Sequence, residues 1–445
     1  MLAQASRLVL ILPHLGMGGA QRVAVTLANH LAQQGVDVHV ITTLAHKEDF
    51  YELSSAVKRK VLTKTRSRTA ATSQDLGSEA LRARLRQRVF DWMRDYPPAF
   101  GIVRGLVDLA RRSYVTLIDL PQIVALFLIN GRLLGRRPNI YLGLLRTTHW
   151  RVAALRDLLK EMEPDVVVSF LGQTNILTIA AASDLQARLV VSERNDPIRQ
   201  ELAKPWQSLR PILYPLADLV TANSHGALEE MQRYCSAAKL AYLPNPVVVP
   251  DRNNARRTNA ILFLARLVHQ KGPDLLIDAF AEFVRENPKW RLQIAGDGPM
   301  KRELTERVHD YGIENNVIFH GMVKDPIPLL LRSRIFVLPS RFEGTPNSLL
   351  EAMSSRLACI VTDASPGPLK LVEHGLSGLV VPNGDASGLA AAMQLLARDA
   401  KLRGTLVRGA WERVKEFQLE NVVEDWRRLL FSPPHSLHRK CNVIN

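Results

Sequence analysis

Short apolar runs alternate with longer amphipathic stretches along most of this chain. In the first half the apolar runs lie at residues 7–13, 36–42, 165–170, 188–192 and 218–221. In the second half they lie at residues 261–266, 291–296, 317–321, 334–340, 358–363 and 378–382. Apolar runs of this length separated by helical periodicity are typical of parallel strands covered by helices. The pattern therefore predicts an α/β fold with two doubly wound, Rossmann-like domains.

A stretch rich in proline, asparagine and arginine, residues 245–257, separates the two series and is expected to be a linker. We therefore expect a first domain over residues 1–244 and a second domain over residues 258–415. Residues 416–431 are expected to form a helix that returns to the first domain, and residues 432–445 a loosely held tail. Ligands of doubly wound sheets bind beyond the carboxyl ends of the strands, so the expected site is a cleft between the two sheets.

The alternation breaks at residues 58–150, which we interpret as a basic, mainly helical insertion in the first domain. This segment contains 18 Lys and Arg against 6 Asp and Glu, a net charge of +12 out of the chain's +15. Such a charge favours an anionic partner. The segment has no aromatic stacking platform or zinc-type spacing, and its arginines are mixed with leucine and valine, so a membrane surface is favoured over nucleic acid. The alternative is a helical segment packed on the first domain with solvated arginines.

Composition narrows the class of protein. With 47% hydrophobic and 23% charged residues in 445, the chain is globular rather than disordered. Its three cysteines exclude a disulfide scaffold and indicate a reducing compartment. The apolar run at residues 8–12 leads into a glycine turn rather than a cleavage site, so it does not predict a signal peptide. No stretch reaches the ~18 apolar residues of a membrane-spanning helix. We expect a cytoplasmic protein without a signal peptide, bound peripherally at the inner face of the membrane.

The most informative motif follows the strand predicted at residues 334–340. Thr345 is expected to cap a helix that begins at Pro346. The backbone N–H groups of Asn347, Ser348 and Leu349 would then be free to bind phosphate oxygens.

Two glutamates accompany this turn, Glu343 before the helix and Glu351 on it. Two carboxylates flanking a phosphate-binding turn could accept hydrogen bonds from the sugar hydroxyls that lie on either side of a nucleotide diphosphate. The alternative is that Glu343 faces solvent in the turn and that Glu351 lies on the helix surface.

Cations follow the first strand of the second domain. Arg266 and Lys271 are spaced so that both could reach one diphosphate, the arginine by bidentate bonding and the lysine as a point charge. The alternative is two solvated loop cations. The chain has no Asp-x-Asp triplet, so we expect no metal at the diphosphate.

Two glycine turns also end predicted strands. Gly296, Gly298 and Pro299 form a tight turn that could face a flat ring. Residues 16–19 end the first strand of the first domain, but they lack the G-x-G-x-x-G spacing, and no acid ends the second strand, so NAD binding is not expected.

Arg-x(4)-Lys, Gly-Asp-Gly-Pro and Glu-x(7)-Glu occur in this order, each at a strand end of one predicted sheet. In this arrangement the sequence resembles the retaining glycosyltransferases of family 4, which have the GT-B architecture. The resemblance covers residues 8–42 and about 165–430, and the basic segment has no counterpart. It implies a second domain that binds the sugar nucleotide and a first domain that faces the acceptor.

The resemblance also implies roles for individual residues. Arg266 and Lys271 would bind the donor diphosphate, Glu351 the nucleotide ribose, and Glu343 would lie beside the donor sugar. The remaining residues expected to contact the donor are Gly18, Gly19, Gly296, Gly298, Pro299, Met322, Val323, Gly344, Asn347, Ser348 and Leu349.

The sequence departs from the family at one point. Many relatives have a histidine after a middle strand of the first domain, where this chain has Ser192, Glu193 and Arg194. That ending resembles the subgroup that elongates lipid-linked oligosaccharides. Glu193 and Arg194 are therefore the candidates for the residue at the reaction centre.

We expect a retaining glycosyltransferase that moves a hexose or N-acetylhexosamine from a UDP-linked donor, with no further cofactor, to a saccharide acceptor. The acceptor is expected to be lipid-linked, in bacterial envelope or exopolysaccharide synthesis. One alternative is a sugar-nucleotide epimerase, or a synthase with a soluble acceptor, on the same fold. The others are a nucleic-acid-binding protein, which the net charge allows, and an inactive scaffold, which the intact motifs disfavour.

Overall fold

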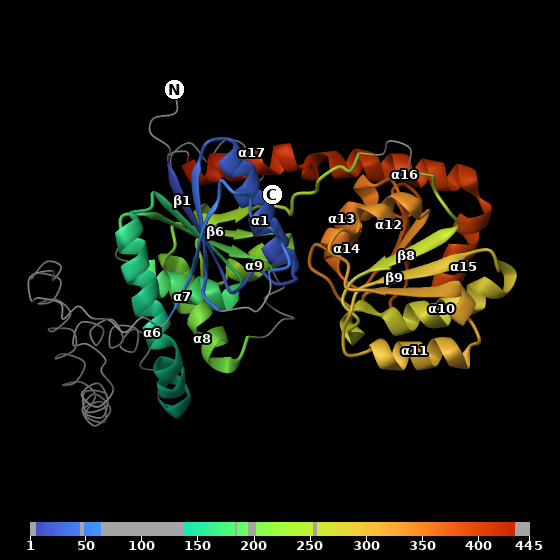
Figure 1. Cartoon of the computed structure of the whole chain (residues 1–445), viewed down its shortest axis with the longest axis horizontal. Helices are drawn as coiled ribbons and strands as arrows, with labels where there is room; N and C mark the ends of the chain where they lie inside the picture. Colours follow the sequence, from blue (N-terminus) through green and yellow to red (C-terminus); the bar gives the residue numbers. More distant parts are fainter. Residues whose placement is uncertain are drawn as a thin grey trace, which may run out of the picture. The chain divides into compact units, whose positions relative to one another are not determined.

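The computed structural model describes residues 6–44, 49–63, 138–182, 185–194, 202–251 and 256–431. Most of the predicted basic segment 58–150 lies outside these residues, and so does the predicted tail 432–445. The described chain contains two parallel sheets, each with its own helices (Figure 1). The predicted fold class is confirmed.

The first domain is built on a seven-stranded sheet of order β3-β2-β1-β4-β5-β6-β7. Its strands are β1 Arg7–Leu12, β2 Asp37–Thr42, β3 Lys58–Val61, β4 Val166–Phe170, β5 Arg188–Glu193, β6 Leu219–Ala222 and β7 Leu240–Tyr242. Its helices are α1 Gly19–Gln33, α6 Pro138–Met162, α7 Gly172–Ala182, α8 Lys204–Leu213 and α9 His225–Met231. The central strands read as continuous apolar runs because both faces of a parallel sheet are buried.

The last helix of the described chain, α17 Leu419–Phe431, belongs to the first domain's core. Val422, Val423 and Trp426 are buried there among residues of β1 and α1. Figure 1 shows this red helix beside the blue α1. Helix α17 therefore follows the second domain in sequence but packs on the first domain.

Residues 58–61, which the sequence pattern assigned to the helical insertion, form the edge strand β3 instead. Three of its four residues are basic, so its sequence has no apolar run by which to predict a strand. An edge strand has one neighbour and exposes much of its side-chain surface, which suits charged residues. Lys58 bonds Asp37 on the adjacent strand at 2.8 Å.

The second domain has a six-stranded sheet of order β10-β9-β8-β11-β12-β13. Its strands are β8 Ala260–Leu264, β9 Arg291–Ala295, β10 Val317–Gly321, β11 Ile335–Leu338, β12 Ala358–Thr362 and β13 Leu379–Val381. Its helices are α10 Pro273–Glu286, α11 Lys301–Asp310, α12 Ile327–Arg332, α13 Asn347–Ser354, α14 Pro366–Leu371, α15 Ala386–Arg398 and α16 Ala400–Val414.

Successive side chains of a strand point to opposite faces of the sheet, so alternate residues of these strands pack into two different hydrophobic cores. Ile261 and Phe263 of β8 pack with α10 and α11, whereas Leu262 of β8 packs with α13 and α16. Figure 1 shows α10 and α11 on one face of this sheet and α12 and α13 on the other. Of the helices that the structure describes, none has a long enough apolar stretch to cross a membrane.

Candidate donor-binding site

The turn between β11 and α13 differs in one detail from the expectation. The cap of α13 is Pro346, not Thr345, and the helix begins at Asn347. No side chain caps this helix, and the Thr345 hydroxyl instead donates to the Asn223 carbonyl at 2.6 Å. The N–H of Leu349 donates to the Pro346 carbonyl at 3.2 Å, so it is not free for phosphate as predicted. The first N–H groups of a helix have no partner within it, which leaves those of Asn347 and Ser348.

Glu343 is buried in this turn, so the solvent-facing alternative is wrong. Its Oε1 accepts hydrogen bonds from Lys271 Nζ at 2.5 Å and from Ser340 Oγ at 2.7 Å. Its backbone N–H donates to Ser365 Oγ at 2.9 Å. The carboxylate is therefore fixed by a cation, a hydroxyl and its own backbone.

Lys271 reaches Glu343 because the turn after β8 lies against the end of β11. Gly272 has a left-handed φ of 64°, and a Cβ there would lie 2.1 Å from the Pro339 carbonyl oxygen. Only glycine permits that approach. The alternative of a solvated loop cation is therefore wrong for Lys271, whose side chain is 18% exposed.

Arg266 lies in the same connection and is exposed. The glycine turn after β9 packs beside it, because a Cβ on Gly296, whose φ is 150°, would lie 1.9 Å from the Ala265 carbonyl oxygen. The Gly296 N–H donates to the Gly321 carbonyl at 2.8 Å, next to the exposed Met322. The structure thus gathers three of the predicted donor-binding segments at the carboxyl ends of β8, β9 and β10.

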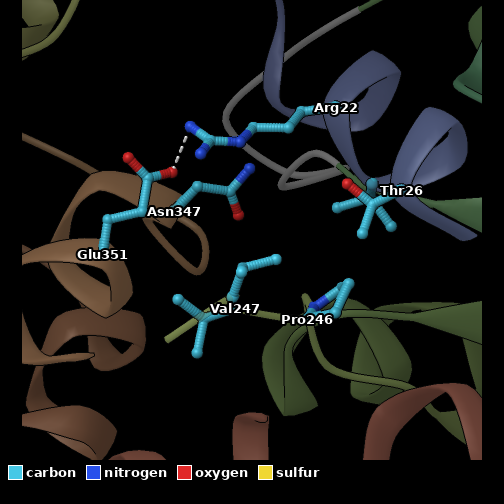
Figure 2. A pocket seen from close by; sticks show the side chains of 8 residues that line it. Arg22, Thr26, Pro246, Val247, Asn347 and Glu351 are labelled. Atoms are coloured by element: carbon cyan, nitrogen blue, oxygen red, sulfur yellow. Dashed lines mark ion pairs between the residues drawn. The ribbon is translucent and has the colours of Figure 1, made fainter. Parts of the chain in front are cut away.

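Glu351 lies on α13 and is buried rather than on the helix surface. Its Oε1 forms an ion pair of 2.5 Å with Arg22 Nη1 from α1 (Figure 2). Burial raises the pKa of the Glu351 carboxyl, and the Arg22 guanidinium opposes that rise. The two residues line a pocket together with Asn347 and residues 246–248.

Asn245, the first residue of the predicted linker, joins both domains through its side-chain amide. Its Nδ2 donates to Asn347 Oδ1 at 2.6 Å and to the Thr345 carbonyl at 3.2 Å. Its Oδ1 accepts a hydrogen bond from Arg194 Nη1 at 3.0 Å. The Asn347 amide in turn donates to the Gly19 carbonyl at 3.3 Å. The start of α13 is thus held by groups of the linker and of the glycine turn before α1.

Arg194 lies inside the first domain, 7% exposed. It donates to Ser192 Oγ at 2.9 Å and to the Leu243 carbonyl at 2.8 Å, and its guanidinium lies 5.2 Å from the Trp426 ring centroid. Burial lowers its pKa to about 9. These contacts tie β5 to the chain that leads into the linker.

Glu193 is fully buried, and its Oε2 accepts a hydrogen bond from Tyr214 at 2.9 Å and pairs with Arg210 at 3.4 Å. Burial raises the pKa of the Tyr214 hydroxyl well above its usual range, and the Glu193 charge adds to that rise. Neither Glu193 nor Arg194 lines the pocket of Figure 2.

Of the residues expected around the donor, the structure brings Lys271 and Glu343 together, and Gly19 with Asn347. Arg22 and Asn245 were not among the residues predicted from the sequence. Arg22 lies three residues after the glycine turn, and Asn245 lies directly before a proline. Both positions are weak signals, because neither requires a particular chemistry. The Leu349 side chain lies in the core of the second domain.

Comparison with known proteins places the chain in a family. A family model described as glycosyl transferases group 1 matches residues 250–413, and one described as glycosyltransferase family 4 matches residues 107–249. A relative from Campylobacter jejuni is 32% identical over 286 residues, which cover 62% of this chain and 77% of that protein. It is named GalNAc-alpha-(1->4)-GalNAc-alpha-(1->3)-diNAcBac-PP-undecaprenol alpha-1,4-N-acetyl-D-galactosaminyltransferase.

A second relative from the same organism is 27% identical over 284 residues, which cover 61% of this chain and 77% of the relative. Its name is N-acetylgalactosamine-N,N'-diacetylbacillosaminyl-diphospho-undecaprenol 4-alpha-N-acetylgalactosaminyltransferase. Among solved structures, Anabaena HepE in complex with UDP matches with a TM-score of 0.65 at 15% identity, covering 96% of this chain and 100% of that one. This likeness confirms the GT-B architecture.

Proposed function

We propose that this chain, which belongs to glycosyltransferase family 4, transfers a sugar from a nucleoside-diphosphate sugar with retention of the anomeric configuration. The observation that carries the proposal is the Lys271–Glu343 pair beside the start of α13. A fixed carboxylate there lies close to a cation and to helix N–H groups that have no partner within the helix. These groups are complementary to a sugar diphosphate: Glu343 would accept hydrogen bonds from the sugar hydroxyls, and Lys271 and the N–H groups of α13 would bind the phosphates.

The chemistry proposed for these residues is stabilisation of the leaving diphosphate. Arg266, Lys271 and the N–H groups of Asn347 and Ser348 would offset the negative charge that develops as the bond from the anomeric carbon to the diphosphate breaks. The acceptor hydroxyl would form the new bond on the same face and give its proton to the departing phosphate oxygen. We propose that the two cations act here without a metal ion, as the missing Asp-x-Asp triplet indicates.

Glu193 and Arg194 would act as positioning residues. Both are buried and bonded to protein groups. Arg194 is linked to the donor-binding helix through Asn245, which bonds both Arg194 and Asn347. We propose that this relay sets the position of α13 relative to the end of β5.

The relatives support a proposal for the substrates. HepE was solved with UDP, and the names of both Campylobacter relatives specify N-acetylgalactosamine transfer to undecaprenol-linked saccharides. We propose a UDP-linked hexose or N-acetylhexosamine as donor and a lipid-linked saccharide as acceptor, in bacterial envelope or exopolysaccharide synthesis.

The experiment that tests this function is a screen of UDP- and GDP-linked sugars, first for thermal stabilisation of the protein and then for hydrolysis with and without excess EDTA. Stabilisation by one UDP-sugar, with EDTA-resistant release of UDP, supports the proposal. Conversion of the sugar nucleotide to an epimer would support the alternative, and activity that requires added Mg²⁺ or Mn²⁺ would refute metal independence.

We also propose that residues 58–150, most of which lie outside the described residues, attach the enzyme to an anionic membrane. Basic residues near an anionic leaflet contribute about 1 kcal/mol each. Sedimentation with anionic and neutral vesicles at low and high salt tests this proposal. Binding that ignores lipid charge, or that persists after Arg82, Arg84, Arg86 and Arg88 become glutamine, would contradict it.

A further inference from the structure

Arg22 is a residue of the first domain that contacts the donor-binding helix of the second. It lies in the first turn of α1, where its backbone N–H donates to the Gly18 carbonyl at 3.0 Å. Its side chain extends to Glu351 and remains 36% exposed, whereas that of Glu351 is only 8% exposed. Figure 2 shows the guanidinium above the carboxylate, with Asn347 beside them.

Only one of the two oxygens of the Glu351 carboxylate has a partner among the described residues. Its Oε1 pairs with Arg22, but its Oε2 is buried and has no hydrogen-bond partner among the described residues. A buried acceptor without a donor costs free energy, and such a group in a native protein calls for an explanation. A ribose hydroxyl is a donor of the right kind.

Burial alone favours the protonated form of Glu351, and a protonated carboxyl is a poorer acceptor. The Arg22 charge opposes this effect. Among the described residues, the Tyr51 hydroxyl, which is bonded to the Gly18 backbone, also lies close to the pair. The ion pair therefore favours the charged form of the carboxylate over the neutral one. It also fixes Oε1, which leaves Oε2 as the oxygen that a ligand can use.

We propose that Arg22 is a positioning residue for the nucleotide: it holds the Glu351 carboxylate by Oε1 so that Oε2 accepts a hydrogen bond from the ribose. The proposal rests on the proposed function, since it takes the ligand to be a nucleoside diphosphate. It adds a charged side chain of the first domain to a donor site whose other charged groups, Arg266, Lys271, Glu343 and Glu351, lie on the second. Donor recognition then depends on both domains, because the carboxylate and its cation lie on different ones.

The test is isothermal titration calorimetry with UDP and with 2′,3′-dideoxy-UDP, which lacks both ribose hydroxyls. Arg22→Gln should bind UDP about tenfold more weakly, the scale for losing a hydrogen bond to a charged group. It should bind the dideoxy nucleotide as the unaltered protein does. Arg22→Lys should recover part of the loss because it keeps the charge.

The control and the double variant separate this role from a structural one. Arg233→Gln removes a guanidinium from an exposed ion pair of the same domain and should leave both affinities unchanged. Glu351→Gln should also lose the preference for UDP, and adding Arg22→Gln to it should cause little further loss.

Three results would overturn the inference while leaving the proposed function intact. They are UDP binding by Arg22→Gln as tight as or tighter than normal, equal loss of UDP and dideoxy-UDP affinity, and additive effects in the double variant. If Arg22→Gln does not fold, the same comparison is made with Arg22→Lys, which must then retain more UDP preference than Glu351→Gln. Failure of the unaltered protein to bind UDP would overturn the inference and the UDP-sugar proposal together.

Discussion

Replacing Asn245 with aspartate should disconnect the linker from the donor-binding helix without changing the shape of the side chain. Asn245 Nδ2 donates to Asn347 Oδ1 at 2.6 Å and to the Thr345 carbonyl at 3.2 Å. An aspartate has only acceptors, so both bonds are lost. Its second oxygen would still accept a hydrogen bond from Arg194, as the amide oxygen does at 3.0 Å.

The expected size of the effect follows from those two bonds. Each contributes about 1 kcal/mol net, so their loss removes about 2 kcal/mol from the interactions that position α13. If all of it is expressed in the transition state, kcat/KM for the donor falls about 30-fold. Rotation of the Asn347 amide could restore one bond, but it would break the bond from Asn347 Nδ2 to the Gly19 carbonyl.

The assay is steady-state release of UDP from the preferred sugar nucleotide, with thermal unfolding measured on the same samples. Asn383→Asp is the matched control, because Asn383 is exposed and its amide makes one long bond of 3.4 Å to the Arg341 carbonyl. It should retain normal kinetics. A kcat/KM for Asn245→Asp equal to that of Asn383→Asp would refute the claim that Asn245 positions the donor-binding helix.

Three further predictions concern the donor site. Arg266→Ala and Lys271→Ala should each lower turnover by at least about 100-fold, the scale for losing one group that stabilises developing charge; near-normal rates in both would refute the diphosphate role. Glu343→Gln should lose most of its activity in the same assay while its circular dichroism and thermal unfolding stay close to normal, and normal turnover would leave Glu343 a structural role only. Because burial raises the pKa of Glu351 above its ordinary value, the folded protein binds more protons than the unfolded chain between the two pKa values, so the free energy of unfolding should fall as pH rises towards the raised pKa. Glu351→Gln should remove this decline in urea titrations at pH 5 and 7.5, and an identical pH dependence in both proteins would contradict it.

The second domain could be predicted closely because its central strands are continuous apolar runs that end at recognisable turns. The same reasoning missed β3 and β7 in the first domain. One is a basic edge strand, and the other has three residues, so neither carries an apolar run long enough to be recognised. The cap of α13 was also misplaced by one residue. The Thr345 hydroxyl instead donates to Asn223, a partner 122 residues away that local pattern does not indicate.

In the candidate site, too, some residues could be predicted from local sequence pattern and others could not. Lys271 and Glu343 could be predicted because each follows a strand of one sheet, and the carboxyl ends of parallel strands meet at one edge. Arg22 and Asn245 could not be predicted, because their partners Glu351 and Asn347 lie far away in the sequence, on α13 of the second domain. Asn245 and Asn347, for example, are 102 residues apart. Local pattern carries no information about which residues such a contact joins.

The central claim is that the chain transfers a sugar from a UDP-linked donor with retention. The measurement that tests it most directly is the proton NMR spectrum of the product formed from the UDP-α-sugar identified in the screen and an undecaprenyl-diphosphate-linked saccharide. The account predicts a new glycosidic bond with the small anomeric coupling of an α-linkage, as in the donor. A product with the large coupling of a β-linkage would contradict it.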